Sequence, residues 1–113
     1  MQAAGQLVRI AQSRYAVIKL GARGALLYDS EEDHPRYIKG FAVEAKDSTA
    51  AGDAFTAAVA AHYLRFGDLA EAVRYGNAAG ALSVTRVGAQ PSLPTSEQVR
   101  GFLRERGVEV LGV

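Results

Sequence analysis

Residues 47–64, DSTAAGDAFTAAVAAHYL, join a run of very small residues directly to an apolar pattern with helical spacing. Phe55, Val59 and Tyr63 recur at every fourth position, which predicts a helix over 53–66 with these side chains in the core. Residues 15–45 are rich in β-forming residues, whereas helical patterns dominate after residue 53. The chain is therefore expected to fold as strands followed by helices, in an α/β or α+β layer arrangement.

The first half predicts one helix and a β-hairpin. Residues 15–20 and 25–29 are expected to pair as strands around the turn residues GARG at 21–24. Residues 36–45 resume β character with a break at Gly40. Before the hairpin, an apolar spacing over 1–14 predicts a helix, with its apolar positions at Ala3, Ala4, Leu7, Val8 and Ala11.

The second half predicts two more helices with recognisable starts. Asp68 is placed to cap a helix over 69–86, and Thr95 or Ser96 to cap a last helix over 96–107. A loop over 87–95 separates them. His62 is expected to be a partly exposed helix residue, because no second histidine or cysteine stands at ligand spacing.

Composition narrows the class of protein. A chain of 113 residues, 49% hydrophobic and 22% charged, suits a single soluble domain over 1–113. A net charge of +1 gives no electrostatic case for nucleic acid or an anionic membrane as a partner. The absence of cysteine excludes disulfides and thiolate chemistry. No secretory signal or membrane span is recognisable, so a cytoplasmic protein is expected.

The small residues before the helix over 53–66 suit an anion. Ala50, Ala51 and Gly52 let a ligand approach the backbone, and the helix start that follows favours negative charge. Together they predict a phosphate site. Asp53 at this point has two interpretations, a helix N-cap or a base that accepts a proton during phosphoryl transfer.

Three segments resemble the ribokinase-like (PfkB) carbohydrate kinases. DSTAAGDAF resembles the C-terminal signature of that family, AVIKLGARGALLY its strand–turn–strand at the nucleotide site, and NAAGALSVTRVGAQPSLPT the segment that closes its adenine pocket. The resemblance covers nearly all of the chain. It implies an α/β fold, the C-terminal part of the ribokinase-like fold, and ATP-dependent phosphoryl transfer to a sugar hydroxyl.

The resemblance also implies a role for each matched residue. Asp53 would be the catalytic base, and the amides around Ala50, Ala51 and Gly52 an anion hole for the transferred phosphoryl group. Asn77 falls where the family contacts adenine. Mg²⁺ would arrive with ATP. The nucleotide would be lined by Lys19, Leu20, Gly21, Ala22, Arg23 and Gly24, together with Gly52 and Asp53.

A monovalent cation, usually potassium, is implied by the same resemblance. Its ligands would be oxygen atoms, several of them main-chain carbonyls, which suit a hard cation. The residues concerned are Asp47, Thr49, Ser83, Arg86, Gly88 and Ser92.

The chain departs from the family pattern in three residues and in length. Ser48 stands where Thr is usual, Ala50 where Gly is commoner, and Lys19 where Thr is common. Lys19 has two interpretations, a phosphate-contacting charge or a solvated lysine at a strand end. Family members are around three times as long, and the part that holds the sugar and the lid has no counterpart here.

That difference in length leaves two functions open. The first is a sugar kinase of which this chain is the nucleotide-binding and catalytic part, with the isolated chain inactive and the sugar, tilted toward ribose, not readable. The second is a non-catalytic nucleotide- or anion-binding module. A homodimer or other self-association is expected in either case, because absent strands would expose a sheet edge and apolar surface.

Overall fold

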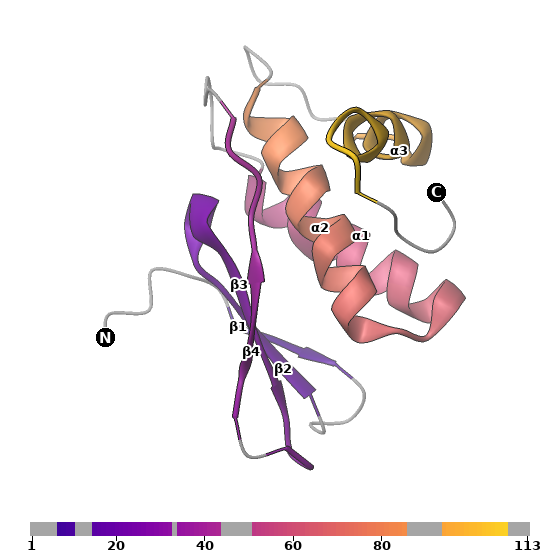
Figure 1. Cartoon of the computed structure of the whole chain (residues 1–113). Helices are drawn as coiled ribbons and strands as arrows, with labels where there is room; N and C mark the ends of the chain where they lie inside the picture. Colours follow the sequence, from indigo (N-terminus) through magenta and orange to yellow (C-terminus); the bar gives the residue numbers. More distant parts are fainter. Residues whose placement is uncertain (1–6, 11–14, 33, 44–50, 86–93, 109–113) are drawn as a thin grey trace.

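The computed structural model describes residues 7–10, 15–32, 34–43, 51–85 and 94–108. Four strands come first in the chain, and three α-helices follow them (Figure 1). The strands are β1 (Leu7–Ile10), β2 (Tyr15–Lys19), β3 (Gly24–Asp29) and β4 (Arg36–Lys39), with the short 3₁₀ turn η1 (Gly21–Arg23) between β2 and β3. The helices are α1 (Ala51–Phe66), α2 (Leu69–Val84) and α3 (Ser96–Glu105).

The strands form one antiparallel sheet in the order β1-β2-β3-β4. The hairpin expected over 15–29 is confirmed: β2 and β3 pair with Val17 opposite Leu27 and Lys19 opposite Ala25. β4 ends at Lys39. The sequence predicts β character as far as residue 45, but residues 40–43 are not part of a strand, and residues 44 and 45 lie outside the described residues.

The prediction of a helix over residues 1–14 is wrong for the part of that segment that the structure describes. Leu7–Ile10 forms β1, which pairs antiparallel with β2 so that Val8 lies opposite Val17. The sequence LVRI is rich in β-branched residues, and pairing to an adjacent strand outweighs a weak helical spacing made largely of alanine. The rest of residues 1–14 lies outside the described residues.

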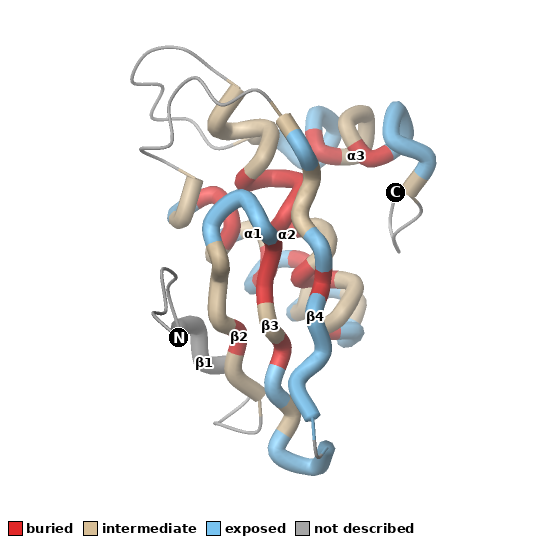
Figure 2. The backbone as a smooth tube through the Cα atoms, turned by 60° about the vertical axis from the view of Figure 1, so that its left-hand side comes forward, coloured by how far each residue is buried: buried red, intermediate tan, exposed pale blue. Residues whose placement is uncertain are grey.

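The helices α1 and α2 form an antiparallel pair that lies on one side of the sheet (Figure 1). Buried residues line the layer between them and the sheet, as Figure 2 shows for β2, β3, α1 and α2. Phe55 and Val59 were expected in the core, and both are fully buried. The core cluster consists of Val17, Ala25, Leu27, Ile38, Phe55, Val59, Leu69, Ala72 and Val73, with Tyr15, Tyr63 and Ala70 packed against it.

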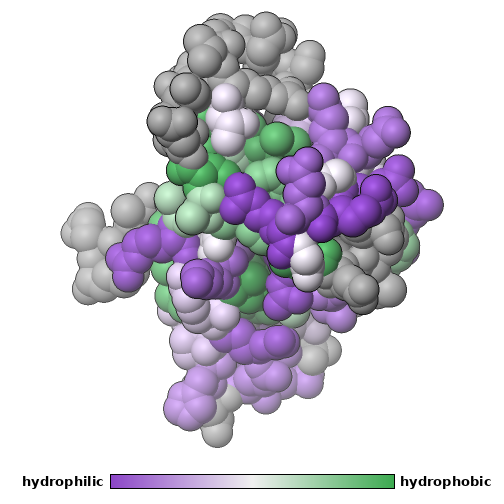
Figure 3. Space-filling view, turned by 45° about the horizontal axis from the view of Figure 1, so that its top comes forward, coloured by the Kyte–Doolittle hydropathy of each residue, from purple (hydrophilic) through white to green (hydrophobic). Residues whose placement is uncertain are grey.

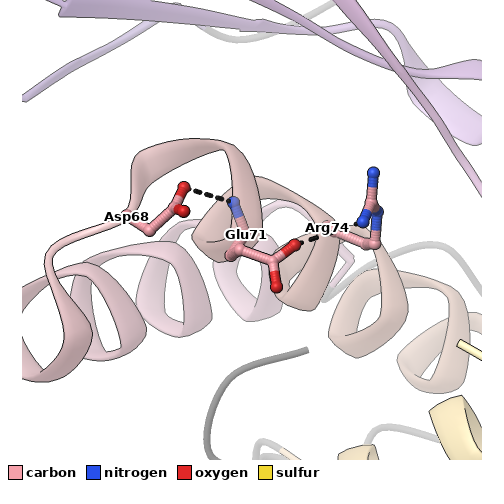
Figure 4. A network of polar contacts seen from close by, with 3 residues as sticks. All are labelled: Asp68, Glu71 and Arg74. Atoms are coloured by element: carbon pink, nitrogen blue, oxygen red, sulfur yellow. Dashed lines mark hydrogen bonds and ion pairs between the residues drawn. The ribbon is translucent and has the colours of Figure 1, made fainter. Parts of the chain in front are cut away.

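Both expected helix caps in the second half are confirmed. Gly67, with φ of +78°, ends the turn after α1, and the Asp68 carboxylate then accepts a hydrogen bond of 3.1 Å from Glu71 N at the start of α2. Arg74 pairs with Glu71 one turn later, at 3.2 Å (Figure 4). Thr95 caps α3 and forms a reciprocal capping box with Gln98.

The helix α3 packs on α2 and creates a second apolar cluster. Ala78 and Ala79 of α2 meet Val99 and Leu103 of α3 there. His62 of α1 is buried, only 4% exposed, so the expectation of a partly exposed residue is wrong. Its ring lies 4.7 Å from that of Phe66 and 4.8 Å from that of Tyr75 in α2, because the close approach of the two helices encloses it. Among the described residues, no helix is long and apolar enough to span a membrane.

Candidate nucleotide and phosphate site

The turn between β2 and β3 is packed against the end of β4. Gly40 N donates a hydrogen bond of 3.1 Å to Arg23 O, and the Tyr37 hydroxyl donates to the same carbonyl. Gly24 has φ of +121°, and a Cβ on it would overlap Ile38 O and lie 2.6 Å from Gly40 N. Only glycine allows this conformation and this approach together, so the turn at 21–24 is held in one shape.

Asn77 ties α2 to the same end of β4. Its side-chain amide donates two hydrogen bonds of 3.2 Å, to Ile38 O and to Lys39 O. Because both contacts are carbonyl oxygens, the nitrogen of the amide must face them and Oδ1 must face the other way. Asn77 is 3% exposed, and its Oδ1 is a buried acceptor without a hydrogen-bond donor among the described residues.

Lys19, at the end of β2, is turned toward η1 and α1. Its ammonium donates to Gly21 O and, at 3.3 Å, to Gly24 O, and it lies 5.3 Å from the centre of the Phe55 ring. The side chain is partly buried, and this burial lowers the pKa of Lys19 below its usual value of 10.5. Lys19 is thus partly buried at the strand end rather than fully solvated.

The first turn of α1 carries the predicted catalytic residues. The helix begins at Ala51, followed by Gly52 and the exposed Asp53. Asp53 is thus the third residue of the helix, and its interpretation as the N-cap is wrong. A Cβ on Gly80 of α2 would lie 3.4 Å from Ala51 O, an ordinary van der Waals distance, so α2 lies next to this turn.

These parts lie at one end of the molecule. In Figure 1 the η1 turn, the start of α1 and the end of α2 all lie in the upper half of the view. Looking toward that end, hydrophobic surface is bordered by hydrophilic side chains (Figure 3). The residues predicted for the nucleotide, 19–24 and Asn77, meet around the end of β4, and Phe55 brings the first turn of α1 close to Lys19.

Most of the predicted cation site cannot be placed. Asp47, Thr49, Arg86, Gly88 and Ser92 lie outside the described residues, as does Ala50 of the anion hole. Ser83 is described, and it lies in the last turn of α2. Within the described ranges, no group of three or more His, Asp or Glu side chains is arranged to hold a metal ion.

Sequence reasoning missed two residues that shape the turn. Gly40 was recognised only as a break in β structure, and Tyr37 was not singled out. A Cβ on Gly40 would lie 2.5 Å from Ala22 O and 3.0 Å from Gly24 N. The available signal was the glycine inside a β pattern, which indicates a close approach of another backbone.

Known proteins share both the sequence and the fold of this chain. The pattern of the family described as "pfkB family carbohydrate kinase" matches residues 1–96. A ribokinase of Haemophilus influenzae is 45% identical over 87 residues, which are 77% of this chain and 28% of that protein. The chain thus spans less than a third of the length of this relative.

Solved structures agree with that assignment. The crystal structure of ribokinase from Thermotoga maritima superimposes with a TM-score of 0.72 at 42% identity, over 80% of this chain and 30% of that one. The structure of Arabidopsis thaliana ribokinase complexed with ribose and ATP has a TM-score of 0.72 at 34% identity, over 80% of this chain and 29% of that one. The expected ribokinase-like α/β fold is confirmed, and this chain corresponds to 29–30% of the length of these two structures. The chain belongs to the pfkB family of carbohydrate kinases.

Proposed function

We propose that this chain is the nucleotide-binding and catalytic part of a kinase that transfers a phosphoryl group from ATP to a sugar hydroxyl. The relatives support the class of reaction: the first is a ribokinase, and the Arabidopsis structure holds ribose and ATP. A pentose such as ribose is the acceptor that these relatives favour.

One observation carries the proposal. Residues 19–24, Asn77 and the first turn of α1 are far apart in the sequence, yet they gather at one end of the fold. The turn at 21–24 is rigid and lacks bulky side chains where Gly24 and Gly40 meet. Asn77 falls where the family contacts adenine, and its two hydrogen bonds to Ile38 O and Lys39 O fix its place at the end of β4.

The proposed chemistry assigns each part a task. Asp53, exposed at the start of α1, would take the proton of the attacking sugar hydroxyl. The backbone amides of residues 50–52 would stabilise negative charge on the transferred group. Mg²⁺ bound with ATP would neutralise the phosphates, and the residues matched to the potassium site would hold a monovalent cation beside the anion hole.

The chain covers only a small share of the length of its relatives, and this favours a second function. It spans 28–30% of the ribokinases described above, so the acceptor-binding groups would lie in the remaining part of such proteins. By itself the chain would then bind a nucleotide or another anion without catalysing transfer.

Calorimetric titration of the 113-residue chain with MgATP tests the proposal. The first titration is made in potassium chloride, and the second with a bulky organic cation in place of potassium. We expect saturable binding that weakens when potassium is removed. Absence of saturable binding in potassium would contradict the proposed nucleotide site.

A phosphorylation assay with ribose separates the two functions. Labelled ATP is incubated with the chain and ribose, and ribose phosphate is measured. Binding of MgATP without ribose phosphate supports the non-catalytic module for the isolated chain, whereas turnover shows that the chain suffices as a kinase.

A further inference from the structure

The end of α3 is fixed by a glycine turn. Gly107, with φ of +71°, follows the helix, and its N–H donates a hydrogen bond to Arg104 O while Val108 N donates one to Leu103 O. This pair of hydrogen bonds is the Schellman arrangement, which ends many helices. Val108 also packs on the apolar cluster that contains Leu103. Arg106, the last residue before the glycine, therefore has a defined place relative to the core.

Arg106 contacts a segment that is distant in the sequence. Its guanidinium donates a hydrogen bond of 2.9 Å to Ala42 O, 64 positions earlier, and its Cζ lies 4.5 Å from the centre of the Phe102 ring. Phe102 in turn meets Phe41 edge to face, with ring centres 5.4 Å apart. Two consecutive residues, 41 and 42, are thus bound to the end of α3, one through its side chain and one through its backbone.

The segment that α3 holds in this way lies beyond the end of the sheet. β4 ends at Lys39, and residues 40–43 are not part of a strand. Among the described residues, no backbone amide donates to Ala42 O, so Arg106 supplies the hydrogen bond that this carbonyl accepts. The contact with α3, rather than strand pairing, therefore holds the chain where it leaves β4.

Gly40 connects this segment to the turn at 21–24. Only one residue separates it from Ala42, and its N–H donates a hydrogen bond of 3.1 Å to Arg23 O. The backbones are so close that a Cβ on Gly40 would lie 2.5 Å from Ala22 O. In Figure 1, α3 lies in the same upper half of the view as the η1 turn. A displacement of the anchored segment would therefore act directly on the contact between Gly40 and the turn.

We propose that Arg106 is a positioning residue for nucleotide binding. From the end of α3 it anchors Ala42 and thereby keeps Gly40 against the turn at 21–24. It acts on the nucleotide through that turn and without touching it. The identity of the ligand rests on the proposed function, whereas the anchoring of Gly40 by Arg106 does not.

Amide hydrogen exchange, followed by NMR on the 113-residue chain, tests the anchoring without any ligand. The exchange rate of the Gly40 amide is compared with that of the Ala72 amide, which donates to Asp68 O in α2. The comparison is made for the wild type and for Arg106→Ala, Arg106→Lys and Arg104→Ala.

Arg104→Ala is the matched control. Arg104 is exposed in the last turn of the same helix, so its removal takes away the same charge near the negative end of the helix dipole. It leaves intact the contacts of Arg106 with Ala42 and Phe102.

We expect Arg106→Ala to speed exchange of the Gly40 amide relative to that of Ala72 by about threefold to tenfold, because one hydrogen bond and one cation–π contact are lost. Arg106→Lys keeps a donor and a charge near the Phe102 ring, so it should stay within about twofold of the wild type, as should Arg104→Ala.

Three outcomes of the exchange experiment would overturn the proposal. Equal acceleration at Gly40 and Ala72 in Arg106→Ala would mean that Arg106 only stabilises the fold as a whole. An equal effect of Arg106→Ala and Arg104→Ala would mean that the charge alone matters. Exchange of Gly40 as fast in Arg106→Lys as in Arg106→Ala would show that the contacts with Ala42 and Phe102 do not anchor the segment.

Calorimetry with MgATP on the same variants separates this inference from the proposed function. Binding that is at least about threefold weaker in Arg106→Ala, and unchanged in Arg104→Ala, supports both. If the wild type binds no MgATP while Arg106→Ala still speeds exchange of Gly40, the anchoring stands and the nucleotide site is contradicted. Equal MgATP affinity of the wild type and Arg106→Ala leaves the function standing and overturns the role of Arg106 in nucleotide binding.

Discussion

At the scale of single residues, the chemistry proposed for this chain depends on where Asp53 stands in α1. The helix begins at Ala51, so the carboxylate of Asp53 belongs to the first turn and is exposed there. An aspartate in this position is not required to cap the helix, which leaves it available for proton transfer. Lys19, in contrast, is partly buried, and this burial disfavours the charged form of its ammonium and lowers its pKa.

The role of Asp53 is testable in a chimera. Residues of this chain would replace the matching 87-residue segment of the Haemophilus influenzae ribokinase. We expect Asp53→Asn in this chimera to lower kcat by at least about 10²-fold with little change in the KM for ATP, because only proton removal is lost. Asp68→Asn is the control, since asparagine caps helices as well as aspartate does. Equal kcat for the Asp53→Asn and Asp68→Asn chimeras would disprove the base assignment.

The partial burial of the Lys19 charge predicts a pH-dependent cost in stability. Because folding lowers its pKa, the folded state binds the proton less tightly than the unfolded chain, and the charged form destabilises the fold at neutral pH. We expect Lys19→Met to have a higher Tm than the wild type at pH 7. The difference should shrink as pH rises through the lowered pKa toward 10.5, where the wild type loses the charge. A gap in Tm that stays constant up to that pH would contradict this account.

At the scale of elements, glycine decides how closely α1 and α2 approach each other. A Cβ on Gly76 would overlap Val59 Cγ2 and lie 3.1 Å from Phe55 Cδ1. Gly80, one turn later, lies against Ala51 O at the start of α1. The lack of a side chain at Gly76 thus permits the close approach of α2 to Val59 and Phe55 of α1.

Substitution of Gly76 should be costly although it improves helix propensity. Gly76→Ala gains about 1 kcal/mol of propensity, but overpacking against Val59 and Phe55 costs about 1–3 kcal/mol. We expect net destabilisation, measured by urea unfolding. Gly101→Ala in α3 is the matched control: a Cβ there meets nothing within 4 Å, so a gain of up to about 1 kcal/mol is expected. If both variants were stabilised, the close approach at Gly76 would be refuted.

At the scale of the whole molecule, Asn77 joins the helical layer to the sheet. Its amide reaches the carbonyls of Ile38 and Lys39, 39 and 38 positions earlier in the chain, respectively. The same carbonyl end of β4 is where Gly40 meets the turn at 21–24. The helical layer is therefore connected through β4 to the turn at 21–24.

Asn77→Asp tests that connection. A carboxylate facing two carbonyls loses both hydrogen bonds and adds repulsion, so we expect a loss of more than about 2 kcal/mol at pH 7. The buried acid should have a raised pKa, which makes the loss smaller as pH falls and the group is protonated. Asn77→Ala, with no titrating group, should lose about 1–3 kcal/mol at every pH. Identical pH profiles for the two variants would argue against a buried contact.

Association of this chain with further copies of itself remains a prediction, and it concerns the surface of the whole molecule. The helices lie on one side of the sheet, and Tyr28 and Tyr37 are 39% and 55% exposed. Such apolar surface favours association in a chain that spans less than a third of its relatives. Light scattering should show a mass above 12.0 kDa that rises with concentration. A constant mass of one chain at high concentration would refute it.

Local chemistry was enough to predict much of this protein from its sequence. The β2–β3 hairpin, the three helices and the caps Asp68 and Thr95 follow from spacing and from side chains that bond to nearby backbone. The family followed from three short motifs. These features involve residues close together in the chain, so their signals are complete within a few positions.

Tertiary structure alone decided what depends on distant partners. Residues 7–10 became a strand because β2 offers an edge, and His62 became buried because α2 lies against α1. The contact of Gly24 with Gly40 and the bonds of Asn77 to β4 join segments that no local pattern relates. Packing and hydrogen bonding act on neighbours in space, and those neighbours exist only after the helices have docked on the sheet.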